Sequence, residues 1–209
     1  MDKLWVFDND GTLYDDSVAH QQFRRLLSEY VAKTLARSQE EAEGILADIK
    51  GRVGRGSVVL ALTREFSLDF DDLVRNVYLR IRLTNCVAAD PGLRGSLLAI
   101  PGPKVILTNN PSEYARKVLE HLGVADCFER IFGMREVNFH LKPDPRAFQS
   151  VRRQFPAAEE IVFCDDHTEH LDEARRQGWR TVLYHPDGMI KPACNHPIIS
   201  NFEEMRALR

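Results

Sequence analysis

Four short apolar runs constrain the fold of this chain more than any other feature of its sequence. They are residues 4–7, 104–107, 161–164 and 181–184, and each ends abruptly at polar or charged residues. A short apolar run closed by a polar turn is typical of a buried strand. Segments with helical spacing lie between the later runs. This alternation predicts an α/β fold, with a parallel sheet flanked by helices.

Two of the intervening helices carry clear start and stop signals. Asn110 and Pro111 predict a helix that begins with proline at its first position. Tyr114 and Val118 then follow at helical spacing, and Gly123 predicts the end. Residues 168–177, closed by a further glycine, repeat the pattern.

One segment interrupts the alternation, because residues 18–83 contain no strand pattern. Two stripes of apolar residues at helical spacing run along it, over residues 23–35 and 70–81. Residues 51–56 are rich in glycine and arginine and predict a flexible break between them. We therefore expect a core domain of residues 1–15 and 89–209, with an all-helical domain, residues 16–88, inserted after the first strand.

Composition excludes several classes of function. Lysine and arginine total 28 against 31 acidic residues, so no basic excess predicts binding to a nucleic-acid polymer. No apolar run approaches the roughly 18–20 residues of a membrane span. The first residues predict a strand, not a signal peptide. The four cysteines lie far apart without a CxxC pair, which predicts reduced thiols and a cytoplasmic location.

Polar side chains that can carry chemistry follow the predicted strands. In open parallel sheets, ligands bind beyond the carboxyl ends of the strands. The residues expected at that edge are Asp8, Asp10, Thr108, Asn109, Lys142, Asp165 and Asp166. Four carboxylates at one edge need a cation, and oxygen ligands favour Mg²⁺. A lysine and a hydroxyl beside that ion would accept a tetrahedral anion. The set predicts phosphoryl transfer through an aspartyl phosphate.

Each of these motifs also has a purely structural interpretation. The pair Asp8 and Asp10 could form a turn or cap a helix, and residues 108–110 could cap the helix that follows them. Lys142 could lie in a surface loop, and residues 165–166 could cap a helix. Each motif lies at the end of a strand or, for Lys142, in a loop on the same edge, and this shared position and order along the chain favour a single site.

The motifs together resemble the signatures of the haloacid dehalogenase-like hydrolase superfamily. Residues 6–14, VFDNDGTLY, are similar to the first signature, and the strand end at Thr108 is similar to the second. Residues 142–145, KPDP, resemble the third, and residues 163–166 with the helix behind them resemble the fourth. The resemblance implies a Rossmann-like core with a C1-type helical cap. The branch most similar contains pyrimidine 5′-nucleotidases.

This resemblance implies a role for each strand-end acid. Asp8 would be the nucleophile that attacks phosphorus. Asp10 would protonate the leaving oxygen and later activate the hydrolytic water. Mg²⁺ would be held by Asp8, by the backbone carbonyl of Asp10 and by Asp166, with Asp165 helping directly or through water.

The same resemblance implies a cradle for the phosphoryl group. Thr108 and Lys142 would bind its oxygens, and Lys142 would also lower the pKa of the nucleophile. Backbone N–H groups around residues 9–11, from Asn9 to Gly11, and at Asn109 would complete the cradle. Glycine at position 11 suits a loop that turns tightly near an anion.

Four further side chains have two interpretations each. His167 and His170 stand where relatives more usually have serine and then glycine or asparagine. They could tune the metal site or contact substrate, or they could lie on the surface of a helix. Arg52 and Arg55 could contact a charged group of the substrate, or they could be solvated residues of a loop.

The function predicted is a Mg²⁺-dependent phosphatase that cleaves small phosphomonoesters, with nucleotides among the candidates. The alternatives are a phosphomutase and a non-catalytic module that binds phosphate or a partner. A dehalogenase is disfavoured because dehalogenating members lack the second acid, here Asp10. The partner expected is a small phosphorylated metabolite, over which the helical cap should close.

Overall fold

The computed structural model describes the chain except for residues 1–2, 55, 89, 187–193 and 209. The chain divides into two compact units. One comprises Met1–Asp16 and Val87–Arg209, and the other is Ser17–Cys86. The sequence predicts the boundary at the start of the smaller unit one residue earlier, and the boundary at its end two residues later, than the structure places them.

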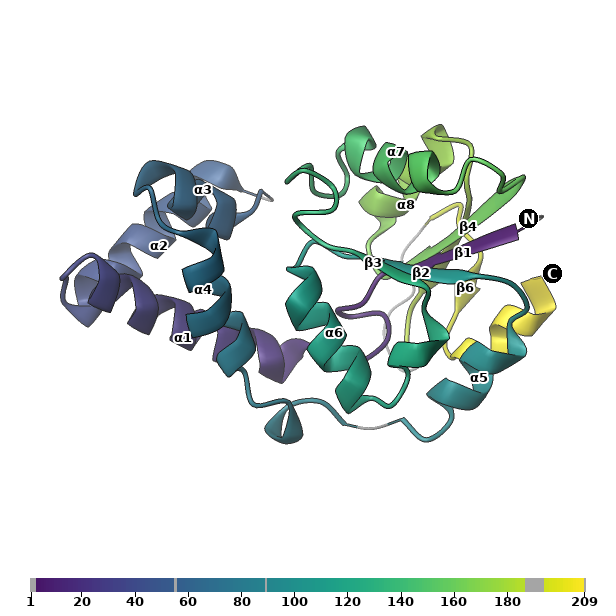
Figure 1. Cartoon of the computed structure of the whole chain (residues 1–209), viewed down its shortest axis with the longest axis horizontal. Coiled ribbons are helices and arrows are strands. Elements are labelled where there is room, and N and C mark those ends of the chain that lie inside the picture. Colours follow the sequence, from purple (N-terminus) through teal and green to yellow (C-terminus); the bar gives the residue numbers. More distant parts are fainter. Residues whose placement is uncertain (1–2, 55, 89, 187–193, 209) are drawn as a thin grey trace. The chain divides into compact units, whose positions relative to one another are not determined.

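The larger unit contains a six-stranded parallel sheet (Figure 1), which confirms the predicted α/β fold. Its strand order is β3-β2-β1-β4-β5-β6. The strands are β1 (Lys3–Phe7), β2 (Lys104–Leu107), β3 (Arg130–Phe132), β4 (Glu160–Asp165), β5 (Arg180–Tyr184) and β6 (Ile198–Ile199). β3 and β6 are not predicted by the sequence, because such short strands carry no periodic signal.

The register of the central strands brings three polar loops to one edge. Phe7 of β1 pairs with Ile106 of β2 on one side and with Cys164 of β4 on the other. The residues that follow these positions therefore leave the sheet side by side. All strands run in the same direction, so these are carboxyl ends, where ligands bind in open parallel sheets.

Helices cover both faces of this sheet (Figure 1). α7 (Pro145–Gln154) and α8 (Thr168–Arg176) lie on one face, and α5 (Leu93–Ala99) and α6 (Ser112–His121) on the other. Two 3₁₀ helices, Ala125–Cys127 and Phe202–Leu208, complete the unit. α6 begins at Ser112, one residue later than predicted, because Pro111 has an extended ψ of 140° and is the N-cap; the Asn110 N–H before it donates to the Thr108 hydroxyl.

The core explains why β1 is apolar on both faces. Leu4 and Val6 belong to the cluster under α7 and α8. On the other face, the centroid of the Phe7 ring lies 6.0 Å from the ring centroids of Phe128 and Phe202. A central strand of a parallel sheet is covered on both sides and reads as a continuous apolar run. Burying one such large side chain contributes roughly 1.5–3 kcal/mol. This packing holds the end of β1, and thus Asp8, in place.

The smaller unit contains helices and no strand within its described residues. They are α1 (Ser17–Thr34), α2 (Gln39–Val53), α3 (Val58–Glu65) and α4 (Phe70–Asn76), followed by 3₁₀ turns at Tyr78–Arg80 and Leu83–Asn85. α1 packs against α2 and α4. Ser38 and Glu41 form a capping box that fixes the start of α2.

Two local expectations for this unit were wrong. The predicted break over residues 51–56 begins later, since α2 continues to Val53 and ends at Gly54, whose φ is 56°. The apolar stripe over 70–81 is not one helix, because α4 ends at Asn76. The side-chain amide of Asn76 donates back to the carbonyl of Asp72 at 2.9 Å. Among the described helices, none has the length and apolar character that crossing a membrane requires.

Candidate active site

The loop after β1 is built to bring two acids to the sheet edge. The Asp8 N–H donates to the carbonyl of Cys164 at 2.9 Å, so Asp8 still pairs with β4, and only 6 % of the residue is exposed. Gly11 follows with φ 77°. A Cβ at this position would stand 2.6 Å from Oδ2 of Asp166, so a side chain here would crowd the opposing acid. Glycine is needed both for the turn and for this close approach.

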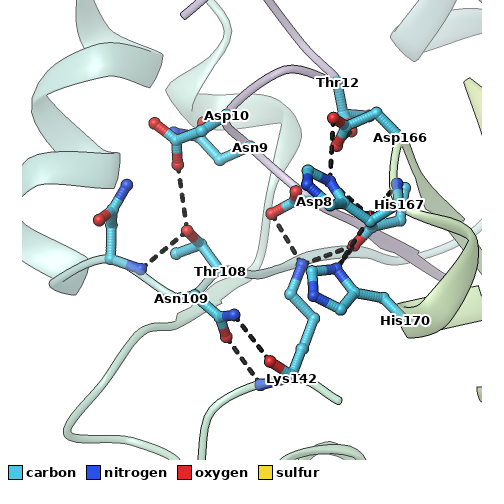
Figure 2. A network of polar contacts seen from close by, with 12 residues as sticks. Asp8, Asn9, Asp10, Thr12, Thr108, Asn109, Lys142, Asp166, His167 and His170 are labelled. Carbon is cyan, nitrogen blue, oxygen red and sulfur yellow. Dashed lines mark hydrogen bonds and ion pairs between the residues drawn. The ribbon is translucent and has the colours of Figure 1, made fainter. Parts of the chain in front are cut away.

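Lys142 lies between two buried carboxylates (Figure 2). Its Nζ is 2.8 Å from Oδ1 of Asp8 and 2.6 Å from Oδ2 of Asp165, and 1 % of its side chain is exposed. The Asn109 side chain holds the loop that carries it. Asn109 Nδ2 donates to the Lys142 carbonyl at 2.9 Å, and the Lys142 N–H donates to Asn109 Oδ1 at 2.7 Å. This leaves the backbone N–H of Asn109 as the group predicted to meet phosphate.

Burial and charge act against each other in this group. Burial raises the pKa of Asp8, the nearby charge of Lys142 opposes that rise, and the charges of Asp165 and Asp166 add to it. Burial also disfavours the charged forms of Asp165 and Lys142. Lys142 nevertheless holds the pKa of Asp165 well below its ordinary value, and Asp165 and Asp8 raise the pKa of Lys142. A cation bound beside Asp8 would favour its ionised form.

The donor set fits a hard divalent cation. Oxygen atoms of Asp8, Asp165 and Asp166 all lie within 4.8 Å of one another. Thr12 Oγ1 donates to Oδ1 of Asp166 at 3.2 Å and orients that carboxylate. Carboxylate oxygens are the ligands that Mg²⁺ accepts. Asp165 already accepts hydrogen bonds from Lys142 and from the His167 N–H, at 2.6 and 2.7 Å. Which of the three carboxylates hold the cation directly stays a prediction.

The two histidines have different surroundings. His170 has 13 % of its side chain exposed, and its Nδ1 lies 3.0 Å from both oxygens of Asp165. Burial lowers its pKa, and Nδ1 is the donor toward Asp165, because a carboxylate only accepts. His170 is therefore not a solvated helix-surface residue. The His167 ring stacks on His170 with 60 % of its side chain exposed, and its contact with Asp166 at 3.0 Å raises its pKa to about 9.

The carboxylate of Asp10 is directed toward the end of β2 (Figure 2). Its Oδ2 accepts from Thr108 Oγ1 at 3.2 Å and from Asn9 Nδ2 at 3.3 Å, and its Oδ1 accepts from the Tyr14 hydroxyl at 2.5 Å. Sequence reasoning missed Tyr14, since the only signal is an aromatic residue four positions after an acid. Asn9 is buried, and its Oδ1 is the one buried side-chain oxygen or nitrogen without a partner among the described residues.

The arginines singled out by the sequence are not in this group. Arg52 lies in the last turn of α2, in the helical unit, and not in a loop as expected. Its guanidinium donates to Asp48 at 2.9 Å and to Glu65 at 2.7 Å. Arg55 is outside the described residues. A contact of either arginine with substrate stays a prediction.

Comparisons with known proteins agree on one family. Residues 3–178 match the model of the haloacid dehalogenase-like hydrolases. A phosphoglycolate phosphatase of Cereibacter sphaeroides is 25% identical over 96% of this chain and 94% of its own length. The solved structure of a phosphatase from Thermococcus onnurineus is similar with a TM-score of 0.70, at 23% identity over 100% of this chain and 97% of that one. A 2-haloacid dehalogenase from Pseudomonas syringae is similar with a TM-score of 0.68, at 22% identity over 100% and 98%.

Proposed function

The chain belongs to the haloacid dehalogenase-like hydrolase family, and we propose that it is a Mg²⁺-dependent phosphatase acting through an aspartyl phosphate on Asp8. One observation carries this proposal. Asp8 lies buried against Lys142 at 2.8 Å, while a second acid, Asp10, is held two residues away by Thr108. A nucleophile, a cation beside it and a separate acid are the groups that ester hydrolysis by covalent catalysis requires.

The first chemical step forms the covalent intermediate. A carboxylate oxygen of Asp8 attacks phosphorus, and the bond from phosphorus to the ester oxygen breaks. Asp10 gives its proton to that oxygen, so the alcohol leaves neutral. Lys142 and the Thr108 hydroxyl bind the phosphoryl oxygens, and their donors stabilise the charge that develops there.

The second step returns the enzyme to its starting state. Asp10, now ionised, takes a proton from a water molecule that attacks phosphorus. The bond from phosphorus to Asp8 breaks, inorganic phosphate leaves, and Asp10 is protonated again. When bound, Mg²⁺, held by Asp8, Asp166 and the Asp10 carbonyl with Asp165 nearby, would neutralise charge on the phosphoryl group and the nucleophile.

The second acid also separates this proposal from a dehalogenase. A halide leaves as a stable anion and needs no proton, whereas an alkoxide is a poor leaving group and does. Asp10 is present and hydrogen-bonded to three side chains, Tyr14, Thr108 and Asn9. This supports ester hydrolysis over carbon–halogen cleavage, although a dehalogenase shares the fold.

The substrate we propose is a small phosphomonoester, and the helical unit is proposed as the cap that closes over it. The similarity to a phosphoglycolate phosphatase supports a small, anionic substrate. The sequence signature of the nucleotidase branch makes pyrimidine nucleotides the second candidate class. The cytoplasmic location and the reduced state of the four cysteines, all free in the structure, stay predictions.

A direct assay tests the proposal. Phosphate release is measured from phosphoglycolate, pyrimidine nucleoside monophosphates and 4-nitrophenyl phosphate, with Mg²⁺ and with excess chelator. Halide release from 2-chloropropionate is measured in parallel, and conversion of a sugar phosphate to its isomer reports mutase activity. We expect phosphate release that requires Mg²⁺, and a weaker apparent affinity for Mg²⁺ in Asp166→Ala. Full activity in chelator, or halide release without phosphate release, would overturn it.

A further inference from the structure

Two buried tyrosine hydroxyls stand behind the carboxylate of Asp10. Tyr14, in the loop after β1, donates to Oδ1 of Asp10 at 2.5 Å and is 8 % exposed. The hydroxyl of Tyr114, on α6, lies 3.3 Å from that of Tyr14, and Tyr114 is 3 % exposed. The proton of Tyr14 is directed at Asp10, so Tyr114 is the donor between the two hydroxyls. All three residues belong to the α/β unit.

This arrangement makes the two oxygens of Asp10 different. Oδ1 accepts a hydrogen bond from the buried Tyr14 hydroxyl at 2.5 Å. An oxygen held by a buried donor is poorly placed to transfer a proton to substrate, which leaves Oδ2 for that step. Oδ2 lies near the Asn9 amide at 3.3 Å and the Thr108 hydroxyl at 3.2 Å, and Thr108 is itself predicted to bind a phosphoryl oxygen.

We propose that Tyr14, supported by Tyr114, is a positioning residue that holds Asp10 with Oδ2 as the oxygen that transfers the proton. The inference rests on the proposed phosphatase function and deepens it. The hydrogen bond from Tyr14 to Oδ1 restricts the carboxyl group of Asp10 to one orientation, and a misplaced acid transfers a proton poorly. Tyr14 does not touch the reacting atoms, so it acts only through Asp10, first where Asp10 donates a proton and later where Asp10 takes one from water.

The step in which Asp10 donates its proton distinguishes a positioning role of Tyr14 from a general loss of structure. When the bond to the ester oxygen breaks, a proton from Oδ2 of Asp10 converts the departing oxyanion into an alcohol. A leaving group that is already stable as an anion, such as dinitrophenolate, gains little from this proton. A phenolate gains more, and an alkoxide gains most. Loss of the Tyr14 hydroxyl should therefore slow the hydrolysis of esters with poor leaving groups more than that of esters with good ones.

The experiment compares Tyr14→Phe with the wild-type chain on phenyl, 4-nitrophenyl and 2,4-dinitrophenyl phosphates in saturating Mg²⁺. The quantity measured is kcat/KM, which covers the steps up to formation of the aspartyl phosphate. We expect a fall of about 10- to 100-fold for phenyl phosphate and less than about 3-fold for the dinitrophenyl ester, within the 10²–10⁴-fold that acid catalysis typically supplies. Tyr114→Phe, which keeps the Tyr14 hydroxyl, should show a weaker selectivity of the same sign.

Tyr30→Phe is the matched control. In the helical unit, the Tyr30 hydroxyl likewise donates to a carboxylate, Oδ2 of Asp72, at 3.0 Å. Its loss should not change the dependence on leaving group. An equal fall on all three esters in Tyr14→Phe, or no fall, would overturn the inference while the proposed function stands. If Tyr14→Phe does not fold, an unchanged dependence in Tyr114→Phe overturns it. A wild-type chain that hydrolyses none of the esters would overturn both.

Discussion

Charged side chains meet opposite conditions in the two units of this molecule. At the sheet edge, Asp8, Lys142 and Asp165 form a chain of contacts in which no side chain is more than 8 % exposed. In the helical unit, Arg52 contacts Asp48 and Glu65 with 43–69 % of each side chain exposed. Water can replace a lost partner in the second case but not in the first. The same residue types therefore hold reactive groups in one unit and mainly provide a polar surface in the other.

Among changes to the buried contacts at the sheet edge and the exposed contacts in the helical unit, Lys142→Met is expected to have the largest effect on stability and activity. This change leaves two buried carboxylates without their cation, and removing one partner of such a buried group typically costs about 3–5 kcal/mol. We expect a loss of that size in the free energy of unfolding, measured by urea denaturation in metal-free buffer. In saturating Mg²⁺, kcat/KM for 4-nitrophenyl phosphate should fall by at least about 10²-fold, because a donor to the phosphoryl oxygens is lost.

Lys104→Met is the control for that experiment. Lys104 is also buried, but it lies at the start of β2, away from the carboxyl ends of the strands, and its Nζ donates to the carbonyl of Gly102 at 3.0 Å. Lys104→Met should change kcat/KM for 4-nitrophenyl phosphate little. Similar activity losses in both variants would mean that Lys142 matters only for folding.

The strand-end pattern explains how much of this site the sequence could predict. β1, β2, β4 and β5 are apolar runs long enough to recognise, and the acids that follow them mark the sheet edge. What the sequence could not supply are contacts that depend on loop conformation. His170 reaches Asp165 across the first turn of α8, and Tyr14 turns back to Asp10. Neither contact follows from spacing alone, because side-chain direction in a loop is set by the packing around it.

Local conformation also decides where α2 ends, which the sequence predicts wrongly. Glycine at positions 51 and 54 predicts a break equally well at either place. A Cβ added at Gly51 would meet nothing within 4 Å, and this glycine stays within α2, whereas Gly54 takes a positive φ and ends the helix. The sequence alone therefore places Arg52 in a loop, although it lies in a helix one turn after its partner Asp48.

The smallest effect is expected for Arg52→Ala. With its ion pairs exposed, the thermal midpoint should not change measurably, and kcat/KM for 4-nitrophenyl phosphate should stay within about 2-fold of the wild type. If Arg52 also contacts the substrate, KM for an anionic substrate such as phosphoglycolate should rise more than kcat changes. Equal effects on both esters, or none on either, would assign Arg52 to the surface of the helical unit alone.

The central claim is that the buried end of β1 supplies the nucleophile, and trapping the intermediate tests it most directly. The enzyme is mixed with substrate and Mg²⁺, quenched in acid within one turnover and reduced with borohydride, which converts an aspartyl phosphate to homoserine. Peptide mass spectrometry then locates the modified residue. We predict homoserine at position 8 in the wild-type chain and none in Asp8→Asn, which should also release no phosphate. Homoserine at another aspartate, or sustained turnover by Asp8→Asn, would contradict the account.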